Sequence, residues 1–485
     1  MNRERVLLIL GSQDIYETDV ADETLQVKKV SLASPMRLDT LITIQPDELI
    51  SQLGVEGVGK VDILDFECLD KQIRQSLGLK AVVGKWNAAN MIATYLGKDE
   101  RKWKEEDYEE LLKELTLCYR EMKLKGKDEW QRIKDIEIPV NKILYETQAK
   151  GIYFNHEETD PMCSGLHRKL YGYKNKIQLD LGYPGDDLIS YLNLHKIEHH
   201  LRRNPSDTEI KHVCKLYPEV EPFWKVKVTE RNLRCLLLLS SVNRETHVCR
   251  PVFKGFASTT GRIFLRDPAL QNLSKKFRTL LKENLHEGWR YEYIDFGQFE
   301  AGILAAITKN EKLQKLYEED KIYETLAAMT RIDRETAKIY FYCFIYGGIV
   351  SKGAERFFNT YDLKNTVDNV VNEGIKQGYV CTPLGNKRVI IDNEERSWIL
   401  NHYIQGTSSL IFKQALINVK STFFDKVELV LPVHDAALFK VHKDVETDRI
   451  ISQFKAAFVK WLPGSKPVIK EKDFFEEGKE RIDRK

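Results

Sequence analysis

Two segments, each with one aspartate at the end of an alternating apolar run, constrain the fold of this chain most. In RYEYIDFGQFE a β-like run ends at Asp295 and a helical pattern follows. In VELVLPVHDAALFKV two β-like runs flank His434 and Asp435, as in a tight hairpin with the carboxylate at its tip. Taken alone, each aspartate is an ordinary turn or cap residue. Two carboxylates that converge on one point could hold the paired metal ions of phosphoryl transfer, about 4 Å apart.

The segment RETAKIYFYCFIYGG lies between these two and is expected to form a helix. Every fourth side chain drifts only about 40° around a helix, so four of them lie along one side: Arg334, Lys338, Tyr342 and Tyr346. Two cations followed by two phenols could hold a triphosphate at one end and stack on a sugar and base at the other. The spacing fits an amphipathic helix with a solvated basic edge equally well, so the helix alone leaves both interpretations open.

The bulk properties limit the class of protein. A length of 485 residues is too great for one ordinary domain and predicts about three. The net charge is only +2, so any phosphate-binding cations must be concentrated locally. Eight cysteines without a CxxC pair argue against a zinc site or a disulfide framework and favour reduced thiols in a cytoplasm. No apolar run approaches membrane length, so we expect a cytoplasmic protein without membrane contact.

The local patterns predict an α/β region followed by helices. Residues 1 to about 97 contain expected strands at RVLLILG, LQVKKVSLA, DTLITIQ and VDILDFE, with a helix beginning at PDELISQLG. From about 100 to 225 the chain is expected to be mostly helical, with an interruption at LGYPGDD. The tail from 465 is highly charged and is expected to be frayed or peripheral.

Six segments, in order, resemble the motifs of family A DNA polymerases, the bacterial polymerase I-like enzymes. IDFGQFEAGILA, RETAKIYFYCFIYG and PVHDA resemble the family's three polymerase motifs. STTGRIFLRDPALQNLS, GYVCTPLGNKR and NHYIQGTSSLIF resemble three further segments of the family. The resemblance implies an α+β fold, a right-hand polymerase of palm, fingers and thumb. It also implies template-directed synthesis on a DNA template and primer from dNTPs, with two Mg²⁺ ions, or Mn²⁺ in their place.

The resemblance carries residue roles over position by position. It implies that Asp295 and Asp435 are metal ligands, with the backbone carbonyl of Phe296 beside them. The residues that it places at the nucleotide are Arg334, Lys338, Tyr342, Tyr346, Gln298, Glu300 and Tyr323, of which Lys338 also acts in catalysis. Glu300 matches the residue that blocks a ribose 2′-OH. The residues that it places at the DNA are Arg262, Gln271, Asn272, Gln405 and His434.

Some positions depart from the family pattern. Gly302 replaces the Arg of the first motif, and Tyr323 replaces the His of the family's DIH-x3-A segment. Cys343 replaces a Gly, and Ala436 replaces the acidic residue after His-Asp. Both aspartates and both phosphate clamps are present, so these departures bear on fine tuning and leave the reaction class unchanged.

The N-terminal segment resembles a 3′–5′ exonuclease domain, which is RNase H-like, through NAANMIATYLG and WKEEDYEELLKEL. That nuclease needs four carboxylates, but Gly11 and Gln13 stand where its first strand reads Asp-x-Glu, and Trp103 replaces its Tyr. Asp107 alone cannot bind two ions. We therefore expect a degenerate exonuclease-like domain without proofreading. An unrelated α/β domain and an active nuclease stay open as alternatives.

The expected domains are 1–135 (degenerate exonuclease-like), 136–255 (thumb and connection) and 256–485 (palm and fingers, with the fingers at about 310–385). The chain also resembles the polymerase-like primases of staphylococcal cassette chromosome elements. That resemblance implies replication of a mobile element, initiation on single-stranded DNA, and a small accessory protein and a helicase as partners. Either a partner protein would then close over the template, or basic residues near the primer segment would hold the initiating triphosphate: Arg262, Arg266, Lys275, Lys276 and Arg278. That these residues only contact primer phosphates stays open as the alternative. The alternative function is a catalytically weak DNA-binding scaffold in a replication complex.

Overall fold

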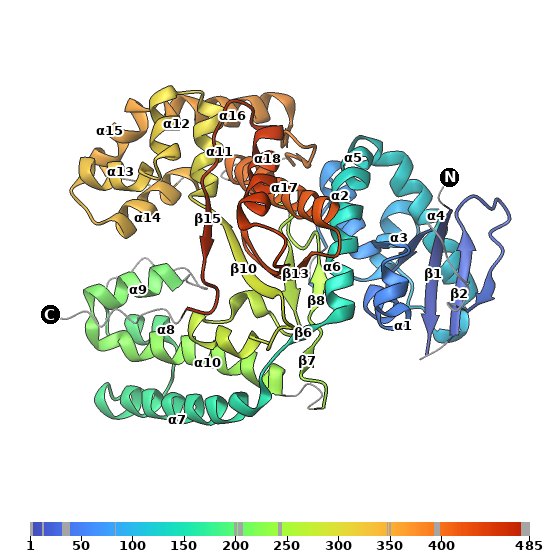
Figure 1. The fold of residues 1–485 in the computed structure, drawn as a ribbon, viewed down its shortest axis with the longest axis horizontal. Coiled ribbons are helices and arrows are strands. Elements are labelled where there is room, and N and C mark those ends of the chain that lie inside the picture. Colours follow the sequence, from blue (N-terminus) through green and yellow to red (C-terminus); the bar gives the residue numbers. More distant parts are fainter. Residues whose placement is uncertain are drawn as a thin grey trace. The chain divides into compact units, whose positions relative to one another are not determined.

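The computed structural model describes residues 3–11, 14–31, 39–82, 84–197, 201, 207–240, 245–346, 348, 351–391 and 398–476. Gln13, one of the positions expected to have lost a nuclease carboxylate, lies outside these residues. The chain forms two compact units (Figure 1). The first comprises Met1–Lys150, Val252–Leu265 and Leu285–Phe474, and the second comprises Gly151–Pro251, Arg266–Asn284 and Phe475–Lys485.

The N-terminal part of the first unit is built on a five-stranded sheet with the order β3-β2-β1-β4-β5. Its strands are β1 (Glu4–Leu10), β2 (Asp14–Asp19), β3 (Lys28–Val30), β4 (Thr40–Thr43) and β5 (Asp62–Asp65). The strands β1, β4 and β5 run parallel, whereas β2 is antiparallel to both of its neighbours. The sequence did not predict β2. The strand predicted at VDILDFE ends at Asp65, because the Asp65 carboxylate caps the next helix by accepting a hydrogen bond from the backbone N–H of Glu67 at 2.9 Å.

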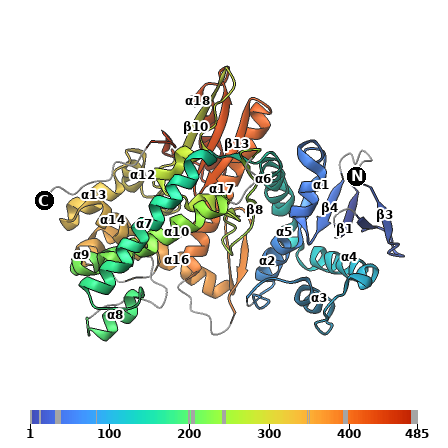
Figure 2. The ribbon, with the colours of Figure 1, turned by 90° about the horizontal axis from the view of Figure 1, so that it is seen from below.

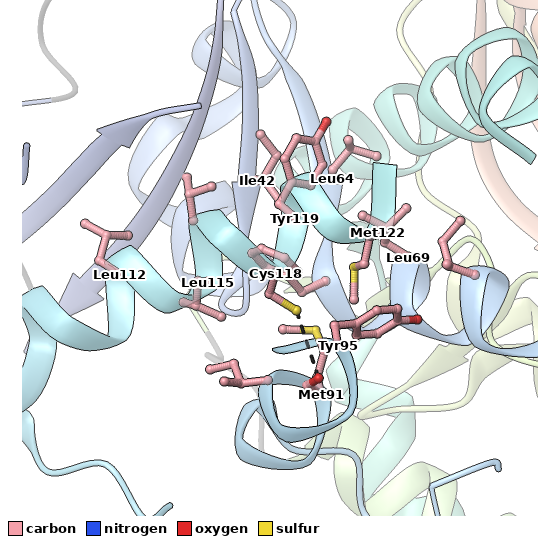
Figure 3. Close-up of a cluster of buried hydrophobic side chains, with 14 of the residues drawn as sticks. Ile42, Leu64, Leu69, Met91, Tyr95, Leu112, Leu115, Cys118, Tyr119 and Met122 are labelled. Atoms are coloured by element: carbon pink, nitrogen blue, oxygen red, sulfur yellow. Dashed lines mark hydrogen bonds between the residues drawn. The ribbon is translucent and has the colours of Figure 1, made fainter. Parts of the chain in front are cut away.

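Alternate residues of β1 face opposite sides of this sheet, and both sides are buried. Val6 and Leu8 join one hydrophobic core, of which Figure 3 shows other members such as Leu69, Met91 and Leu115, whereas Leu7 and Ile9 join a second core with Leu49 and Ile50. Figure 2 shows α1 across the sheet from α3 and α4. The expected α/β region is therefore a three-layer structure. Its helices are α1 (Pro46–Val58), α2 (Phe66–Ser76), α3 (Ala88–Leu96), α4 (Tyr108–Lys125), α5 (Lys127–Arg132), the π-helical turn η2 (Ile133–Glu137) and α6 (Ile138–Lys150).

A four-stranded antiparallel sheet, in the order β13-β14-β10-β15, forms the centre of the rest of the first unit. Its strands are β10 (Trp289–Phe296), β13 (Val427–Val433), β14 (Ala436–His442) and β15 (Ile469–Lys472). The expected strand at Asp295 and the expected hairpin at His434 and Asp435 are both confirmed. The sheet packs on α18 (Thr447–Trp461), where Phe454 lies 5.3 Å from Phe296 between ring centroids.

The expectation that the tail from 465 is frayed or peripheral is wrong for its described part. β15 pairs with β10 in the central sheet, and Phe474 beyond it is 3% exposed. Backbone hydrogen bonds to β10 stabilise this strand despite its charged side chains, because every residue type other than proline offers the same backbone donor and acceptor.

The helices on this sheet carry the remaining motif segments. They are α11 (Phe299–Thr308), α12 (Glu311–Glu318), α13 (Ile322–Thr330), α14 (Arg334–Ile345), α15 (Lys352–Thr360), α16 (Leu363–Gln377) and α17 (Trp398–Phe423). Short strands complete the unit: β8 (Val252–Lys254), the hairpin β11 (Tyr379–Cys381) and β12 (Lys387–Val389), and β9 (Phe264–Arg266) at its boundary. The helix expected at RETAKIYFYCFIYGG is α14. It begins at Arg334 because the Asp333 carboxylate accepts a hydrogen bond from the Thr336 N–H at 3.0 Å.

The ring of Tyr317 leaves no room for a side chain at Gly302 of α11. A Cβ at Gly302 would lie 2.1 Å from Tyr317 Cζ, a distance that real Cβ atoms do not show. Tyr317 is 1% exposed, and its hydroxyl accepts a hydrogen bond from the Val468 N–H at 3.3 Å. The tyrosine therefore fills the space beside the position at which the family pattern has Arg.

The second unit is mainly helical. It contains β6 (Ile152–Tyr153), α7 (His156–Asp180), α8 (Leu188–Leu194), α9 (Asp207–Leu216), α10 (Glu221–Ser240), β7 (Val248–Cys249) and the 3₁₀ turns η4 (Leu270–Asn272) and η5 (Lys275–Leu281). Ile177, Leu192, Ile210 and Phe223 contribute to a core shared by its four helices. The interruption expected at LGYPGDD separates α7 from α8. Within the described ranges, no helix has the length and apolar character of a membrane span.

Four buried charges connect the N-terminal part of the first unit to helix α17. Arg132 binds the Glu129 carboxylate at 2.6 Å and the Glu137 carboxylate at 2.7 Å. The ammonium of Lys413, in α17, binds the second oxygen of Glu137 at 2.7 Å. All four side chains are at most 2% exposed, so their charges must be paired to be tolerated. The backbone N–H of Lys387 donates to Glu129 at 3.1 Å and extends the chain to the β11–β12 hairpin.

We predict that Lys413→Met lowers the free energy of unfolding by about 3–5 kcal/mol, because it leaves Glu137 buried with only one of its two cations. The double variant Glu137→Gln/Lys413→Met should recover part of this loss. Lys420→Met is the matched control, since Lys420 lies on the same helix and binds Glu146 at 2.7 Å but is 34% exposed. Lys420→Met should lower the free energy of unfolding by less than about 1 kcal/mol. Urea denaturation of the full chain measures all three, and equal losses in the two single variants would contradict the prediction.

We also predict that Gly302→Ala destabilises the first unit by about 1–3 kcal/mol, because the new methyl overlaps the Tyr317 ring. Gly353→Ala in α15 is the control, since its Cβ would meet Thr330 at an ordinary 3.4 Å. Adding Tyr317→Leu to Gly302→Ala should relieve the overlap. Thermal melting measures these differences. Equal melting temperatures for the Gly302→Ala and Gly353→Ala proteins would show that the Tyr317 ring moves aside freely.

Candidate active site

The two aspartates come together because β10 lies beside the β13–β14 hairpin. Asp295 is directly opposite Ala436, the residue after Asp435. The backbone N–H of Phe296 donates to the Asp435 carbonyl at 3.4 Å. The hairpin turn consists of His434 and Asp435, and His434 adopts a φ of +57°. The structure thus places both aspartates at one end of the central sheet, where the charge of Asp295 acts on the Asp435 carboxylate.

The acids at this end repel one another. Desolvation raises the pKa of Asp435 to about 7; the charges of Glu300 and Asp295 add to this rise, while Arg262 opposes it. Asp295 has a cation beside it, because the Lys472 ammonium forms an ion pair with its carboxylate. A bound cation would relieve the repulsion, so the two aspartates fit a metal site.

The oxygen donors suit a hard ion such as Mg²⁺, which binds through one or two carboxylates and completes its shell with waters and phosphates. Among the described residues, no cluster of three or more His, Cys, Asp or Glu could hold a metal by itself. A metal here would therefore depend on Asp295, Asp435 and the Phe296 carbonyl, with its remaining ligands supplied by substrate and water.

Four of the expected site residues form one hydrogen-bonded network around Glu300. Glu300 is 4% exposed, and its carboxylate accepts from Arg262 Nη2 and from the Tyr346 hydroxyl, both at 2.7 Å. Gln405, on α17, donates to the Tyr346 hydroxyl at 2.8 Å. Burial, with the Glu300 charge, raises the pKa of Tyr346, so its hydroxyl stays protonated and donates to Glu300. The network holds Glu300 in one position beside the two aspartates.

The two cations and two phenols expected along one side of α14 follow one another there, with Tyr346 directly after the last residue of the helix. The rings of Tyr342 and Tyr346 stack at 5.9 Å, and Lys338 Nζ lies 6.0 Å from the Tyr342 ring centroid. Arg334 is ion-paired with Glu324 and lies 5.6 Å from the ring of Tyr323. Tyr323 is 2% exposed, and its position under Arg334 places it near this face of α14. Arg334 and Lys338 are exposed.

The remaining expected site residues lie outside the Glu300 network. Gln298 has a left-handed backbone, and its side-chain amide donates to the carbonyl and the carboxylate of Asp320 at 3.0 and 2.7 Å. His434 is exposed at the hairpin turn. Arg262 belongs to the first unit, whereas six other residues of the primer segment belong to the second unit: Arg266, Gln271, Asn272, Lys275, Lys276 and Arg278.

Sequence reasoning missed the contribution of β15. Lys472 contacts Asp295, and Lys470 forms an ion pair with Asp320. The only signal was the spacing of two lysines by two residues in IKEK, which places them on one face of a strand. A four-residue charged run has no apolar alternation, so it resembles a loop or a tail.

Comparison with known proteins agrees with this geometry. Residues 226–458 match the model of DNA polymerase family A. DNA polymerase I of Bacillus subtilis is 23% identical over 376 residues, which cover 66% of this chain and 43% of that protein. DNA polymerase I of Streptococcus pneumoniae is 28% identical over 239 residues, covering 40% of this chain and 27% of that protein. The chain therefore spans less than half the length of these curated relatives.

A solved structure extends the likeness to almost the whole fold. The chain resembles the POL domain of Pol1 from M. smegmatis, in complex with DNA primer-template and dNTP, with a TM-score of 0.76. The match covers 97% of this chain and 94% of that one, at 16% identity, and so concerns the fold. The similarity to DNA polymerase family A therefore rests on residues 226–458, just under half of the chain, and on a fold that is alike over nearly its whole length.

Proposed function

We propose that this chain is a DNA-directed DNA polymerase that extends a primer along a template with dNTPs. The observation that carries the proposal is the convergence of Asp295 and Asp435 at one end of the central sheet, within the segment that matches the family. The Glu300 network and the ordered side of α14 lie in the same unit and supply the groups that a nucleotide needs. A bound primer-template and dNTP in the related fold agree with this proposal.

Asp295, Asp435 and the Phe296 carbonyl would hold Mg²⁺, or Mn²⁺ in its place, and two such ions would supply charge stabilisation for phosphoryl transfer. The chain's own residues bind and orient the nucleotide. Arg334 and Lys338 are placed one turn apart to hold its phosphates, and Tyr342 follows one turn later to stack on its sugar and base. Before the phosphates bind, Arg334 is paired with Glu324, so binding exchanges one anion for another.

Glu300 is suited to choosing the sugar. Its carboxylate is held rigidly by Arg262 and Tyr346, so it cannot rotate away from a bulkier substrate. A fixed group rejects an added hydroxyl more strongly than a mobile one does, because the clash cannot be relaxed. We therefore propose that Glu300 excludes a ribose 2′-OH.

We propose that residues 1–135 are a degenerate exonuclease-like domain without proofreading. The mixed five-stranded sheet with helices on both faces supports an RNase H-like architecture. Gly11 ends the first strand with a φ of +61°, and Asp107 is held in a turn by the Lys104 N–H at 3.2 Å. Gly11 has no carboxylate and Asp107 supplies only one, so these positions provide no carboxylate pair on the sheet. This supports the loss of the nuclease centre.

The finer parts of the proposal rest on sequence resemblance. They are the thumb at 136–255, the palm and fingers at 256–485 with the fingers at about 310–385, initiation without a primer, a mobile element, an accessory protein and helicase, and a cytoplasmic location. The contrasting candidate is a DNA-binding scaffold with weak catalysis. Retention of both aspartates and both α14 cations favours the polymerase, because a scaffold needs phosphate contacts but no converging carboxylates.

The first prediction of this proposal is that Asp295→Asn and Asp435→Asn each reduce nucleotide incorporation by at least about a hundredfold, or ~3 kcal/mol, because metal charge stabilisation is lost. Primer-template affinity should stay nearly unchanged. Single-nucleotide extension of a labelled primer and fluorescence anisotropy measure the two properties. Asp444→Asn is the control, since Asp444 is an exposed residue paired with Lys426 beyond β14. Substantial synthesis by either site variant would leave the scaffold as the better description.

The second prediction is that Glu300→Ala increases ribonucleotide incorporation relative to deoxynucleotide incorporation by about tenfold or more, because the group that blocks the 2′-OH is removed. Tyr342→Phe should leave this ratio unchanged but increase rejection of dideoxynucleotides, since the phenol can replace the hydrogen bond of a missing 3′-OH. Competition between nucleotides at one template position measures both ratios. The proposed pocket would be refuted by an unchanged ribonucleotide ratio in Glu300→Ala together with unchanged dideoxynucleotide rejection in Tyr342→Phe.

A further inference from the structure

Two lysines of β15 reach the catalytic end of the central sheet. Lys470 lies directly opposite Asp295 in the antiparallel register, and Lys472 is two residues further on, so both side chains share the face of Asp295. The Lys472 ammonium forms an ion pair with the Asp295 carboxylate. The Lys470 ammonium instead forms an ion pair with Asp320. The two cations therefore have different partners although they leave the same strand.

Gly297 leaves room for this arrangement. A Cβ at Gly297 would lie 3.0 Å from Lys470 Cε and 2.8 Å from Val468 Cγ1, so a side chain there would displace the lysine stem. Asp320, the partner of Lys470, also accepts from Gln298 at 2.7 Å. Lys470 is thus held in a network of its own, and Lys472 is the lysine of this strand that neutralises Asp295.

The Lys472–Asp295 pair is placed to be exchanged. The Lys472 side chain is 48% exposed and the Asp295 side chain 20% exposed, so water screens the pair and the attraction between its charges is weak. The Lys472 stem is flexible, and its ammonium can move to another anion without a change in the strand. A divalent cation that binds Asp295 would compete with this ammonium for the same carboxylate oxygens.

We propose that Lys472 is a built-in counter-ion of Asp295 that a divalent metal must displace, so that metal binds weakly before the nucleotide arrives. The inference rests on the proposed metal role of Asp295. A nucleotide triphosphate brings oxygen ligands for the metal and acceptors for the freed ammonium together. The metal therefore enters with the nucleotide, and Lys472 moves from the carboxylate to the phosphate side of the site.

The test measures Mn²⁺ binding to the full chain without DNA or nucleotide, by electron paramagnetic resonance of the free ion. Lys472→Met and Lys472→Gln should bind Mn²⁺ about three- to tenfold more tightly than the parent chain, because the competing cation is gone. Lys472→Arg keeps the charge and should bind like the parent. Lys466→Met removes the same charge from the same segment, where Lys466 pairs with Glu318 at 3.5 Å, and should also bind like the parent.

The outcomes separate this inference from the proposed function. Equal Mn²⁺ affinity in the parent chain and both neutral Lys472 variants, each with a normal melting curve, would overturn the role of Lys472. Absence of binding in both neutral variants would overturn it as well. If Asp295→Asn binds Mn²⁺ as the parent chain does, the metal role of Asp295 is itself wrong. A gain in both neutral variants that Asp295→Asn abolishes would support the counter-ion.

Discussion

The antiparallel register of β10 is the constraint on which the site depends. On one side, the register sets Asp295 opposite Ala436 and thereby beside Asp435. On the other side, it sets Asp295 opposite Lys470. A slip of one residue would turn every side chain of β10 to the other face of the sheet. The two aspartates would then separate, and the β15 lysines would lose their partners. The pairings of β10 with β14 and with β15 therefore position both the carboxylates and the cations around them.

A second constraint joins the N-terminal part to this site. Glu137 holds Lys413 of α17, and the same helix carries Gln405, which reaches the hydroxyl of Tyr346. Gln75 of α2 donates to Asn386 beside the β11–β12 hairpin at 2.6 Å. The N-terminal part therefore has a structural role, because removing it would leave the buried charge of Lys413 unpaired.

The cations of the site are already paired with acids of the chain. Arg262 binds Glu300, Arg334 binds Glu324 and Lys472 binds Asp295. Under the proposed function, a bound triphosphate would replace the acid partners of Arg334 and Lys472, which costs little because both pairs are partly exposed. The pairing is consistent with the net charge of only +2, because these cations are balanced by acids of the chain itself.

The sequence by itself determined the parts that depend on local spacing: the strand at Asp295, the hairpin at Asp435, the helix α14 and the ordered motifs of the family. Each is set by the periodicity of a few neighbouring residues, which the chain carries wherever it folds. Only the tertiary structure decided what faces Asp295 across the sheet, what fills the space beside Gly302, and which acid neutralises Lys413. β2 and β15 escaped prediction because short, charged strands owe their conformation to the ladder of a neighbour. That pairing is a contact between distant parts of the chain, and no local pattern encodes it.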